Sequence, residues 1–488
     1  MPQLPPVYLY GQPIETVTSI LYLGVTIDNR LNFCEHISNK IEAATAKLGL
    51  LRKKIYDCRG PNPLWLKYAY EAVAVPTLTY ACHVWAHRMN ASHKKKLVDL
   101  KRMACNIITS FVGRPPTNGL EIILGIRPLL LTIEMSAIEK AIAIKGKFKT
   151  AWNTMVMKSR SCSRQGFRYR NEMMAKKYGV TIDDIDRINK RQPYSYFLKE
   201  ELPHPDITIY TDGSKMDGKV GFAAVIEGNF SKELSGSLSA DATVFQAEIQ
   251  AILVGVQCLL DEGIKKSIIN IYSDSMSSIQ CLTSVSLRSK LGIRTKEKLN
   301  LLCKNNLVAL TWVKAHVGIA GNERADLLAK EGRLKPMEIT TLKPLASIKA
   351  KMHGKANLLW KNEWLNSKGR DQTKFWYKGP QPDKHKEVIK LDKETLNIFT
   401  QFITGFNRLG RHMHKVNATI QRDCRLCGEP TEDSIHLATD CDALLPKSRL
   451  ILGRFHEDHS KWSISQLIEF LREPVVWGLL RERRMVEV

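Results

Sequence analysis

The sequence has no long apolar run, since no segment approaches the ~18–20 consecutive apolar residues of a membrane-spanning helix. The first residues, MPQLPPVYLYG, lack the basic and then apolar layout of a secretory signal peptide. Cysteine is sparse, with eleven mostly scattered residues, and an odd number suits a reducing compartment better than a disulfide framework. We therefore expect an intracellular protein of the nucleus or cytoplasm that has no membrane partner.

Acidic residues are also in short supply. The 488 residues contain 49 Asp and Glu against 73 Lys and Arg, which gives a net charge of +24. Such an excess favours a polyanionic partner, and because the membrane alternative lacks support, nucleic acid is the expected one. Low-complexity tracts and internal repeats are absent, and 44% of the residues are hydrophobic, so several packed domains are expected.

The positive charge is concentrated outside the centre of the chain. Residues 206–332 contain fourteen basic and fourteen acidic residues, whereas residues 140–200 contain fifteen basic and five acidic ones. The second segment includes a basic run that contains no acid: Lys145, Lys147, Lys149, Lys158, Arg160, Arg164, Arg168 and Arg170. Two interpretations remain open, a solvated linker face or a segment that grips nucleic-acid phosphates.

Four regions differ in pattern. Residues 1–135 begin with a strand-like run at 20–27 and continue as helices, because apolar residues recur at helical spacing over 37–51 and 64–80. Residues 136–205 are expected to form a basic helical connector. Residues 206–332 alternate strands and helices, and residues 333–488 form a helical tail that contains a small Cys/His cluster.

The central region is predicted to be an α/β domain. Its five strands are expected at 207–211, 221–226, 234–238, 267–273 and 308–313. Gly213 and the Asp217-Gly218 pair predict the turn between the first two strands. A helix follows the third strand, with Thr243 as N-cap and Gln246 completing a capping box, and a last helix is expected to begin near Asn322. This order predicts a mixed five-stranded sheet with helices packed on it, flanked by mainly α-helical regions.

Four acidic residues of this region have unusual positions. Asp212 and Asp274 end the first and fourth predicted strands, and Asp326 is expected in the first turn of the last helix. Taken singly, these three fit turn, capping or helix-dipole roles. Glu248 lies on the apolar stripe of its helix, where an isolated carboxylate is costly unless it is paired or bound to a metal. Together the four carboxylates indicate an oxygen-only site for Mg²⁺ or Mn²⁺, as two-ion phosphodiester cleavage requires.

Four sequence blocks carry these acids: TDGS at 211–214, QAE at 246–248, YSDS at 272–275 and WVKAHVGIAGNERAD at 312–326. They resemble the signature blocks of type 1 ribonuclease H, and the last one matches the pattern H-x-G-x-x-G-N-E-x-A-D at every fixed position. The resemblance implies a ribonuclease H-like fold at residues 206–332. It also implies an endoribonuclease that cuts the RNA strand of RNA–DNA hybrids and leaves a 5′-phosphate and a 3′-hydroxyl.

The same resemblance implies a role for each residue. Asp212 would bridge two Mg²⁺ or Mn²⁺ ions, Asp326 would bind the ion on the water side, and Glu248 and Asp274 would bind the other. His316 is similar to the family's mobile histidine, which assists proton transfer or product release, and is otherwise a surface histidine. No extra basic helix stands between the fourth and fifth strands, so the grip on the hybrid is expected from the basic flanks.

The first region carries the strings YLGVTID at 22–28, RLNF at 30–33 and YACHVW at 80–85, and later PL at 128–129. They resemble the stretch after the catalytic palm in reverse transcriptases of Jockey- and I-type non-LTR retrotransposons, which implies a thumb-like region. A polymerase palm needs an Asp-Asp pair on a hairpin and an earlier Asp, whereas the only pair here, Asp183-Asp184, lies in a polar helical stretch. We expect a truncated retrotransposon polyprotein that does not polymerise DNA. The alternatives are a catalytically inactive nucleic-acid-binding remnant and part of a longer working reverse transcriptase.

Near the C-terminus, Cys424, Cys427, His436 and Cys441 follow the spacing C-x2-C-x8-H-x4-C. Four such ligands suit a closed tetrahedral Zn²⁺ site. Similar clusters close the polyproteins of the same retrotransposons, after a stretch like TGFNRL at 404–409. The alternative is three free thiols and a nearby histidine. A further pair, at 456 and 459, reads as surface histidines.

Overall fold

The computed structural model describes residues 7–57, 61–147, 167–182, 185–186, 188, 190–369, 371–453 and 461–481. The chain divides into two compact units, one made of Met1–Ala137 with Gly354–Val488 and the other of Ile138–His353. Half of the basic run (Lys149, Lys158, Arg160 and Arg164), the Asp183-Asp184 pair, and His456 and His459 lie outside the described residues. The four regions drawn from the sequence stay a prediction, but the tail from Gly354 onward shares one unit with the N-terminal helices.

A mixed sheet forms the centre of the second unit. Its strands are β7 (Ile207–Met216), β8 (Lys219–Gly228), β9 (Lys232–Leu238), β10 (Ile268–Ser273), β12 (Leu307–Trp312) and β13 (Met337–Ile339). They lie in the order β12-β10-β7-β8-β9-β13. The pairs β7–β8 and β8–β9 are antiparallel, whereas β10 is parallel to both β7 and β12. The expected α/β fold with a mixed five-stranded sheet is confirmed, and β13 adds a short sixth strand parallel to β9.

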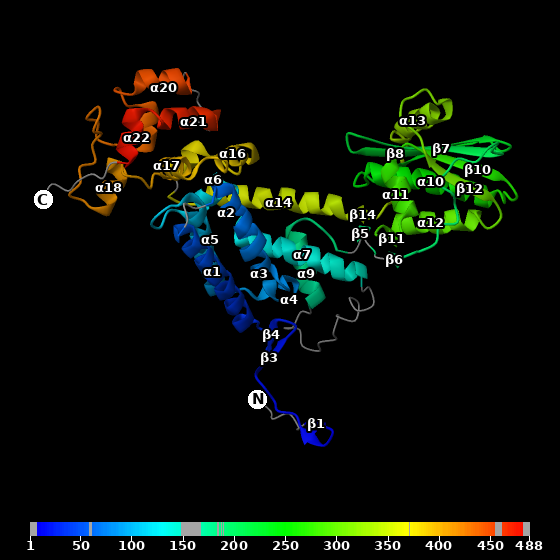
Figure 1. Cartoon of the computed structure of the whole chain (residues 1–488), viewed down its shortest axis with the longest axis horizontal. Coiled ribbons are helices and arrows are strands. Elements are labelled where there is room, and N and C mark those ends of the chain that lie inside the picture. The colour runs from blue at the N-terminus through cyan, green and yellow to red at the C-terminus, as the bar shows by residue number, and fades with distance from the viewer. Residues whose placement is uncertain are drawn as a thin grey trace. The chain divides into compact units, whose positions relative to one another are not determined.

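Helices cover both faces of this sheet (Figure 1). One face carries α10 (Val244–Asp261), α11 (Met276–Thr283) and α12 (Lys290–Leu302), and the other carries α13 (Ala320–Gly332). On the first face, Ile252 and Leu299 are fully buried against the sheet. On the second face, Ala329 packs on Val225 of β8. The central strands are therefore buried on both sides, which explains their nearly continuous apolar sequence.

Two expectations about the surroundings of the acids are wrong. β7 continues past residue 211 to Met216, so Asp212 and Gly213 lie inside a long hairpin whose turn is Asp217-Gly218, both at positive φ (50° and 76°). The last helix begins at Ala320 rather than near Asn322, because Ile319 is its N-cap with extended backbone (φ −75°, ψ 108°). Asp326 therefore lies in the second turn of this helix.

Short elements precede and follow the sheet. They are α9 (Phe167–Lys177), β5 (Ile185–Asp186), β6 (Lys190–Arg191), β11 (Ser286–Leu287) and β14 (Lys343–Pro344). Asp186 accepts hydrogen bonds from Gln246 Nε2 at 3.2 Å and from Ser289 Oγ at 2.7 Å. This buried carboxylate thus ties the segment before the sheet to the N-termini of α10 and α12.

The first unit is mainly helical. Its N-terminal part contains β1 (Tyr8–Leu9), β2 (Gln12–Pro13), β3 (Ser19–Tyr22), β4 (Val25–Asp28), α1 (Cys34–Asp57), α2 (Pro63–Ala69), η1 (Tyr70–Ala74), α3 (Val75–Thr79), α4 (Cys82–Trp85), η2 (Ala86–Arg88), α5 (Ala91–Thr109) and α6 (Thr117–Leu124). The helices expected over 37–51 and 64–80 are confirmed. The single strand expected at 20–27 is wrong, because Leu23 and Gly24 take positive φ and reverse the chain between β3 and β4.

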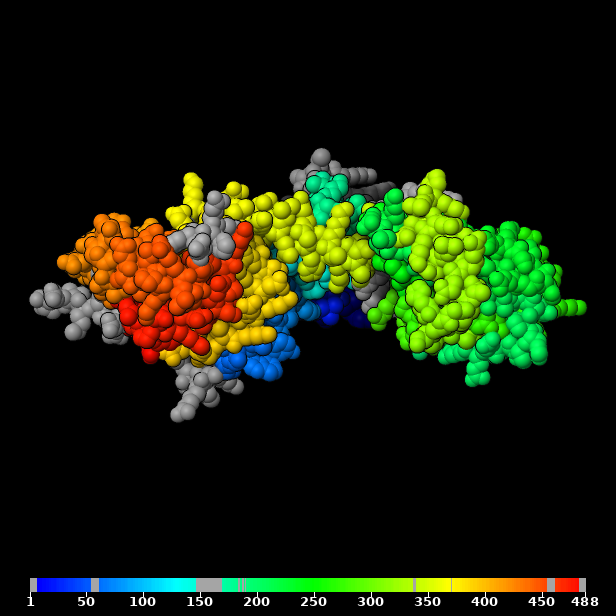
Figure 2. Space-filling view, turned by 90° about the horizontal axis from the view of Figure 1, so that it is seen from above, coloured from blue at the N-terminus to red at the C-terminus, as the bar shows by residue number. Residues whose placement is uncertain are grey.

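The tail supplies the remaining helices. They are α15 (Asp371–Trp376), α16 (Pro382–Val388), α17 (Lys393–Thr404), α18 (Gly410–Val416), α19 (Ser434–Thr439), α20 (Leu445–Leu452), α21 (Ile464–Leu471) and α22 (Pro474–Arg481). Two long helices, α7 (Leu129–Lys147) and α14 (Leu345–Asn366), contain the boundaries between the units. Aromatic contacts hold the tail together, with the ring centroids of Phe402 and Phe470 at 6.2 Å and those of Trp376 and Phe402 at 5.4 Å. Figure 2 shows the tail as one continuous surface from its golden helices to its red end.

One helix among the described residues, α10, is long and apolar enough to cross a membrane. It is 67% buried inside the protein, as the core helix of a sheet is.

Candidate active site and a second candidate metal site

Asp212 and Asp274 are brought together by strand register. In the parallel pairing of β7 and β10, the last matched residues are Thr211 and Ser273, and the two aspartates are the next residues on each chain. Thr211 Oγ1 donates a hydrogen bond to the Tyr272 carbonyl at 3.0 Å, which fixes the strands at this level. The carboxylates of Asp212 and Asp274 are therefore side by side on neighbouring strands.

Glu248 reaches the same place from α10. The expected capping box is present, since Gln246 N donates to Thr243 Oγ1 and Thr243 N donates to Gln246 Oε1, each at 3.3 Å. Gly213 lets the helix approach β7, because a Cβ at this residue would lie 2.6 Å from the Glu248 nitrogen. Ligand oxygens of Asp212, Glu248 and Asp274 consequently lie within 4.8 Å of one another.

Burial and mutual repulsion disfavour the charged forms of these three carboxylates. Burial, reinforced by the charges of Asp212 and Asp274, raises the pKa of Glu248 to about 9. Burial and the neighbouring acids raise the pKa of Asp212 to about 7, and burial also raises that of Asp274. A cation placed among them would oppose both effects, since its positive charge would offset the lost hydration and the repulsion between the carboxylates.

Asp326 lies beside this group on α13. Its charge raises the pKa values of Asp212 and Asp274, and Lys330 Nζ lies 2.6 Å from its carboxylate. Ligand atoms of Asp326, Glu323 and His316 also lie within 4.8 Å of one another. The fourth predicted acid therefore connects the other three carboxylates, of which Asp212 and Glu248 are buried, to a more exposed group.

His316 stands on the loop before α13. Its side chain is exposed, its backbone is left-handed (φ 54°), and its charge lowers the pKa of Asp274. Trp312, at the end of β12, donates from its indole nitrogen to the Asp274 carbonyl at 2.9 Å. The histidine thus faces the acids from a loop, and the tryptophan fixes the backbone that carries one of them.

Three contributors escaped the sequence reasoning. Glu323 is a fixed residue of the recognised block and lies three positions before Asp326, a spacing that places both on one helix face. The sequence predicts Gly213 as a turn residue, whereas in the structure it lies inside β7 and admits the close approach of α10. Trp312 opens the same block, but nothing in its spacing reveals a hydrogen bond to Asp274.

The donor set fits divalent magnesium or manganese. All four acids offer only oxygen, the ligand that these hard cations prefer. Glu248 Oε2 is buried and has no hydrogen-bond partner among the described residues. A buried polar atom without a partner is costly in a folded protein, and a bound cation would satisfy it.

The cysteines and histidine of the tail also come together. Ligand atoms of Cys424, Cys427, His436 and Cys441 lie within 4.8 Å of one another, with 3.2 Å between Cys427 Sγ and His436 Nε2 and 3.9 Å between Cys424 Sγ and Cys441 Sγ. A tight turn that closes at Gly428 (φ 80°) carries the first two, and α19 carries the histidine. Three cysteine sulfurs and one histidine nitrogen at such distances have the composition of a structural zinc site.

Buried acids support this cluster from outside. The Glu432 carboxylate is fully buried, accepts from Arg425 Nε at 2.8 Å and from the Gly410 nitrogen at 2.7 Å. Asp433 caps α19 by accepting from the His436 nitrogen at 2.9 Å, and its other oxygen lies 2.5 Å from Arg411. The cluster is thereby tied to the start of α18.

Comparison with known proteins gives an independent view of the sheet region. Residues 204–333 match the RNase H family. The chain is 33% identical over 146 residues to the ribonuclease H of Bradyrhizobium diazoefficiens, an alignment that covers 27% of this chain and 92% of the relative. It is 35% identical over 141 residues to the ribonuclease H of Maricaulis maris, covering 26% of this chain and 92% of the relative.

A third relative is of a different kind. The chain is 28% identical over 108 residues to a probable RNA-directed DNA polymerase from transposon X-element of Drosophila melanogaster, covering 22% of this chain and 12% of that protein. The bacterial enzymes, by contrast, are matched almost from end to end, and the family match spans the five strands of the sheet from β7 to β12 and all four acids. Through residues 204–333, this chain belongs to the ribonuclease H family.

Proposed function

We propose that this chain is an endoribonuclease that hydrolyses the RNA strand of RNA–DNA hybrids. The observation that carries the proposal is the convergence of Asp212, Glu248, Asp274 and Asp326 from separate elements, with one buried Glu248 oxygen left without a partner among the described residues. Family membership supports the same chemistry, because the bacterial relatives are named ribonuclease H.

In the proposed mechanism, the four acids would hold two Mg²⁺ or Mn²⁺ ions: Asp212 would contribute to both, Asp326 to the water-side ion, and Glu248 with Asp274 to the other. When bound, such ions activate water and stabilise the leaving oxygen. The protein holds mutually repelling carboxylates together and shields them from bulk water. Because their pKa values are raised to about 7 for Asp212 and about 9 for Glu248, cation binding at neutral pH displaces protons from this pair.

His316 is proposed to assist proton transfer or product release. Its imidazole is exposed on the loop before α13 and lies near enough to lower the pKa of Asp274, so it can reach both solvent and the reacting phosphate. Such a position suits a group that must exchange protons with water in each turnover.

Cleavage of a labelled RNA–DNA hybrid tests the proposal. We expect Mg²⁺- or Mn²⁺-dependent cutting of the RNA strand with 5′-phosphate and 3′-hydroxyl ends, and no cutting of the same RNA alone or in an RNA duplex. Hybrid binding without cleavage in either ion would favour the inactive nucleic-acid-binding remnant. DNA synthesis on a primed template would instead favour part of a longer reverse transcriptase.

The proposed setting is a truncated retrotransposon polyprotein of the Jockey or I type. The strings at 22–33 and 80–85 support it, together with the likeness to the X-element polymerase, of which the chain covers 12%. The basic flanks are proposed to hold nucleic-acid phosphates. Replacing Lys158, Arg160 and Arg164 with Ser is then expected to flatten the salt dependence of hybrid binding by about 0.9 per lost contact.

We also propose that Cys424, Cys427, His436 and Cys441 bind one structural Zn²⁺ ion. The close approach of the four ligand atoms supports this second site. Its soft sulfur and nitrogen donors differ from the oxygen donors of the carboxylate site, so each site selects a different metal.

A further inference from the structure

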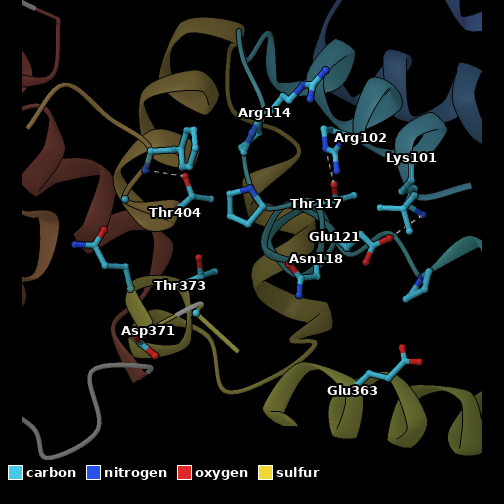
Figure 3. Close-up of a pocket in the computed structure, with 18 of the residues that line it drawn as sticks. Lys101, Arg102, Arg114, Thr117, Asn118, Glu121, Glu363, Asp371, Thr373 and Thr404 are labelled. Atoms are coloured by element: carbon cyan, nitrogen blue, oxygen red, sulfur yellow. Dashed lines mark hydrogen bonds and ion pairs between the residues drawn. The ribbon is translucent and has the colours of Figure 1, made fainter. Parts of the chain in front are cut away.

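A cavity of about 670 Å³ lies in the unit made of the N-terminal helices and the tail, which does not contain the ribonuclease acids. Its walls come from α5, the segment that leads into α6, the end of α14, α15, and the segment from Thr404 through α18 (Figure 3). This volume is within the range of about 300–1,000 Å³ that encloses small organic ligands. The cavity is therefore large enough for one or two nucleotides and too small for a double helix.

Positive side chains line the cavity from three different segments. Lys94 of α5, Arg114 before α6 and Lys415 of α18 are exposed, and none of them has a carboxylate partner among the described residues. Figure 3 shows Arg114 and Arg102 on the same side. Cations spread over three segments fit an extended anion better than one small anion, and the net charge of +24 favours nucleic acid as that anion.

The opposite side of the cavity is acidic and polar. Figure 3 shows Glu363 and Asp371 away from the two arginines, with Asn118 and Thr373 between. Gln372 Nε2, from the same wall, is buried and has no hydrogen-bond partner among the described residues. Carboxylates repel phosphate but accept hydrogen bonds from the amino groups of bases.

The walls are fixed by buried contacts. Lys101 is 1% exposed, and its Nζ donates to the Arg127 carbonyl at 2.5 Å and lies 4.0 Å from the buried Glu121. On the tail side, the ion pair between Arg411 and Asp433 fixes the start of α18, which carries Lys415. Phe406 and His412 of this wall have ring centroids 4.4 Å apart and offer aromatic faces. The shape of the cavity thus exists before a ligand enters.

We propose that this cavity binds a single strand of nucleic acid. Phosphates lie against Lys94, Arg114 and Lys415, and unpaired bases point toward Glu363 and Asp371. A duplex does not fit, because its base edges are already paired and its rigid cylinder cannot enter. Aromatic and basic side chains along one groove are the usual means of holding single strands. The proposal does not depend on the ribonuclease activity of the other unit.

The test uses the full chain without added Mg²⁺ and without a chelator, so that the Cys/His cluster stays intact, and a fluorescent, unstructured RNA strand of about 12 nucleotides, within the usual range of site sizes. The cavity variant combines Arg114→Glu with Lys415→Glu. Its control combines Lys355→Glu with Lys378→Glu, which changes the same charge at exposed lysines outside the cavity. We expect the cavity variant alone to lose about tenfold or more in affinity, with the salt slope flattened by about 1.4 for two lost contacts.

Binding of other nucleic acids to the same variants provides outcomes that would contradict the proposal. DNA of the same sequence is expected to behave like the RNA strand. Equal affinity and slope in the cavity variant and the control would contradict the proposal, as would an equal loss for a blunt RNA duplex. Competition by a free nucleoside monophosphate as strong as by the strand would replace it with a nucleotide site. Unchanged circular dichroism of both variants verifies that each is folded.

Discussion

The carboxylate site and the Cys/His cluster each bring four side chains together, but the two sites are assembled in different ways. The cluster is contained in eighteen consecutive residues, 424–441, and needs only a turn and a short helix. The carboxylates are distributed over residues 212–326 and meet only because the sheet sets the register of the strands that carry them. The comparison teaches that a locally encoded site suits a structural metal, whereas a site built across a sheet has the rigidity that catalysis needs.

Removing the carboxylate of Asp212 is expected to have the largest effect on the rate of hybrid cleavage. In the proposed mechanism both ions would share Asp212, so Asp212→Asn is expected to lower hydrolysis of the hybrid by at least ~10³-fold. The fold is expected to persist, because the substitution keeps the shape and relieves repulsion from Asp274 and Asp326. Steady-state cleavage of the hybrid in Mg²⁺ measures the loss.

The matched control is Asp217→Asn in the turn of the same hairpin. Asp217 is exposed at φ 50°, a conformation that Asn accepts readily, so its activity is expected to equal that of the wild type. Full activity of the Asp212→Asn protein would remove Asp212 from the site.

Disrupting the Cys/His cluster is expected to change stability without changing catalysis. Zinc binding is worth about 10–16 kcal/mol in zinc-finger peptides, as much as the stability of many domains. Cys427→Ser, or a zinc chelator, is therefore expected to expose residues 420–445 to protease while hybrid cleavage in Mg²⁺ continues. Zinc per chain and the rate of proteolysis are the measurements.

Cys34→Ser serves as the control, because Cys34 is an exposed free thiol outside the cluster. It is expected to keep both the zinc and the protease resistance. A wild-type chain that carries no zinc, or a cluster variant as resistant as the wild type, would leave Cys424, Cys427 and Cys441 as ordinary thiols.

A smaller effect is expected on the pH dependence of the free energy of unfolding, which the buried carboxylate of Glu248 controls in part. The pKa of Glu248 is raised from 4.5 to about 9 in the folded protein, so the folded state binds more protons than the unfolded state between these values. The free energy of unfolding of the metal-free sheet is therefore greatest below about pH 4.5 on account of this group and falls as pH rises toward about 9. Mg²⁺ is expected to restore stability at the alkaline end.

Hydrogen exchange of peptides from β7 and α10, corrected for intrinsic rates, measures this effect between about pH 5 and pH 9. Glu248→Gln is expected to remove most of the fall in the free energy of unfolding between these pH values. Glu227 is an exposed acid of β8, and Glu227→Gln is expected to leave this fall unchanged. An equally steep decline in the Glu248→Gln protein would show that another group is responsible.

The smallest expected effect tests the backbone support of the site. Trp312→Phe removes the 2.9 Å hydrogen bond from the indole nitrogen to the Asp274 carbonyl. One such bond is worth about 0.5–1.5 kcal/mol, which corresponds to a loss of about two- to tenfold in kcat with little change in KM. Trp65→Phe, at an exposed indole of α2, is the control. A larger change in KM than in kcat would indicate that Trp312 contacts the hybrid instead.

Much of the fold was predictable because its signals are local. The capping box at Thr243 and Gln246 involves neighbours in sequence, and the Asp217-Gly218 turn follows from residues that tolerate positive φ. The placement of strands and helices in residues 206–332 was largely right for the same reason. The errors occurred where local signals conflict with long-range pairing, as at Gly213, where a residue typical of turns continues β7 because β8 pairs with it.

The sequence by itself determined which residues are candidates for the chemistry: four acids in recognisable blocks, a histidine on a glycine-containing loop, and three cysteines with a histidine at close spacing. Only the tertiary structure decided that Asp212 and Asp274 are neighbours, that Gly213 admits α10, and that the tail closes a cavity with the N-terminal helices. The physical reason is that residue type and short-range spacing fix local conformation, whereas proximity between distant segments depends on register and close packing. These arise from the whole set of contacts, and no single stretch of sequence contains them.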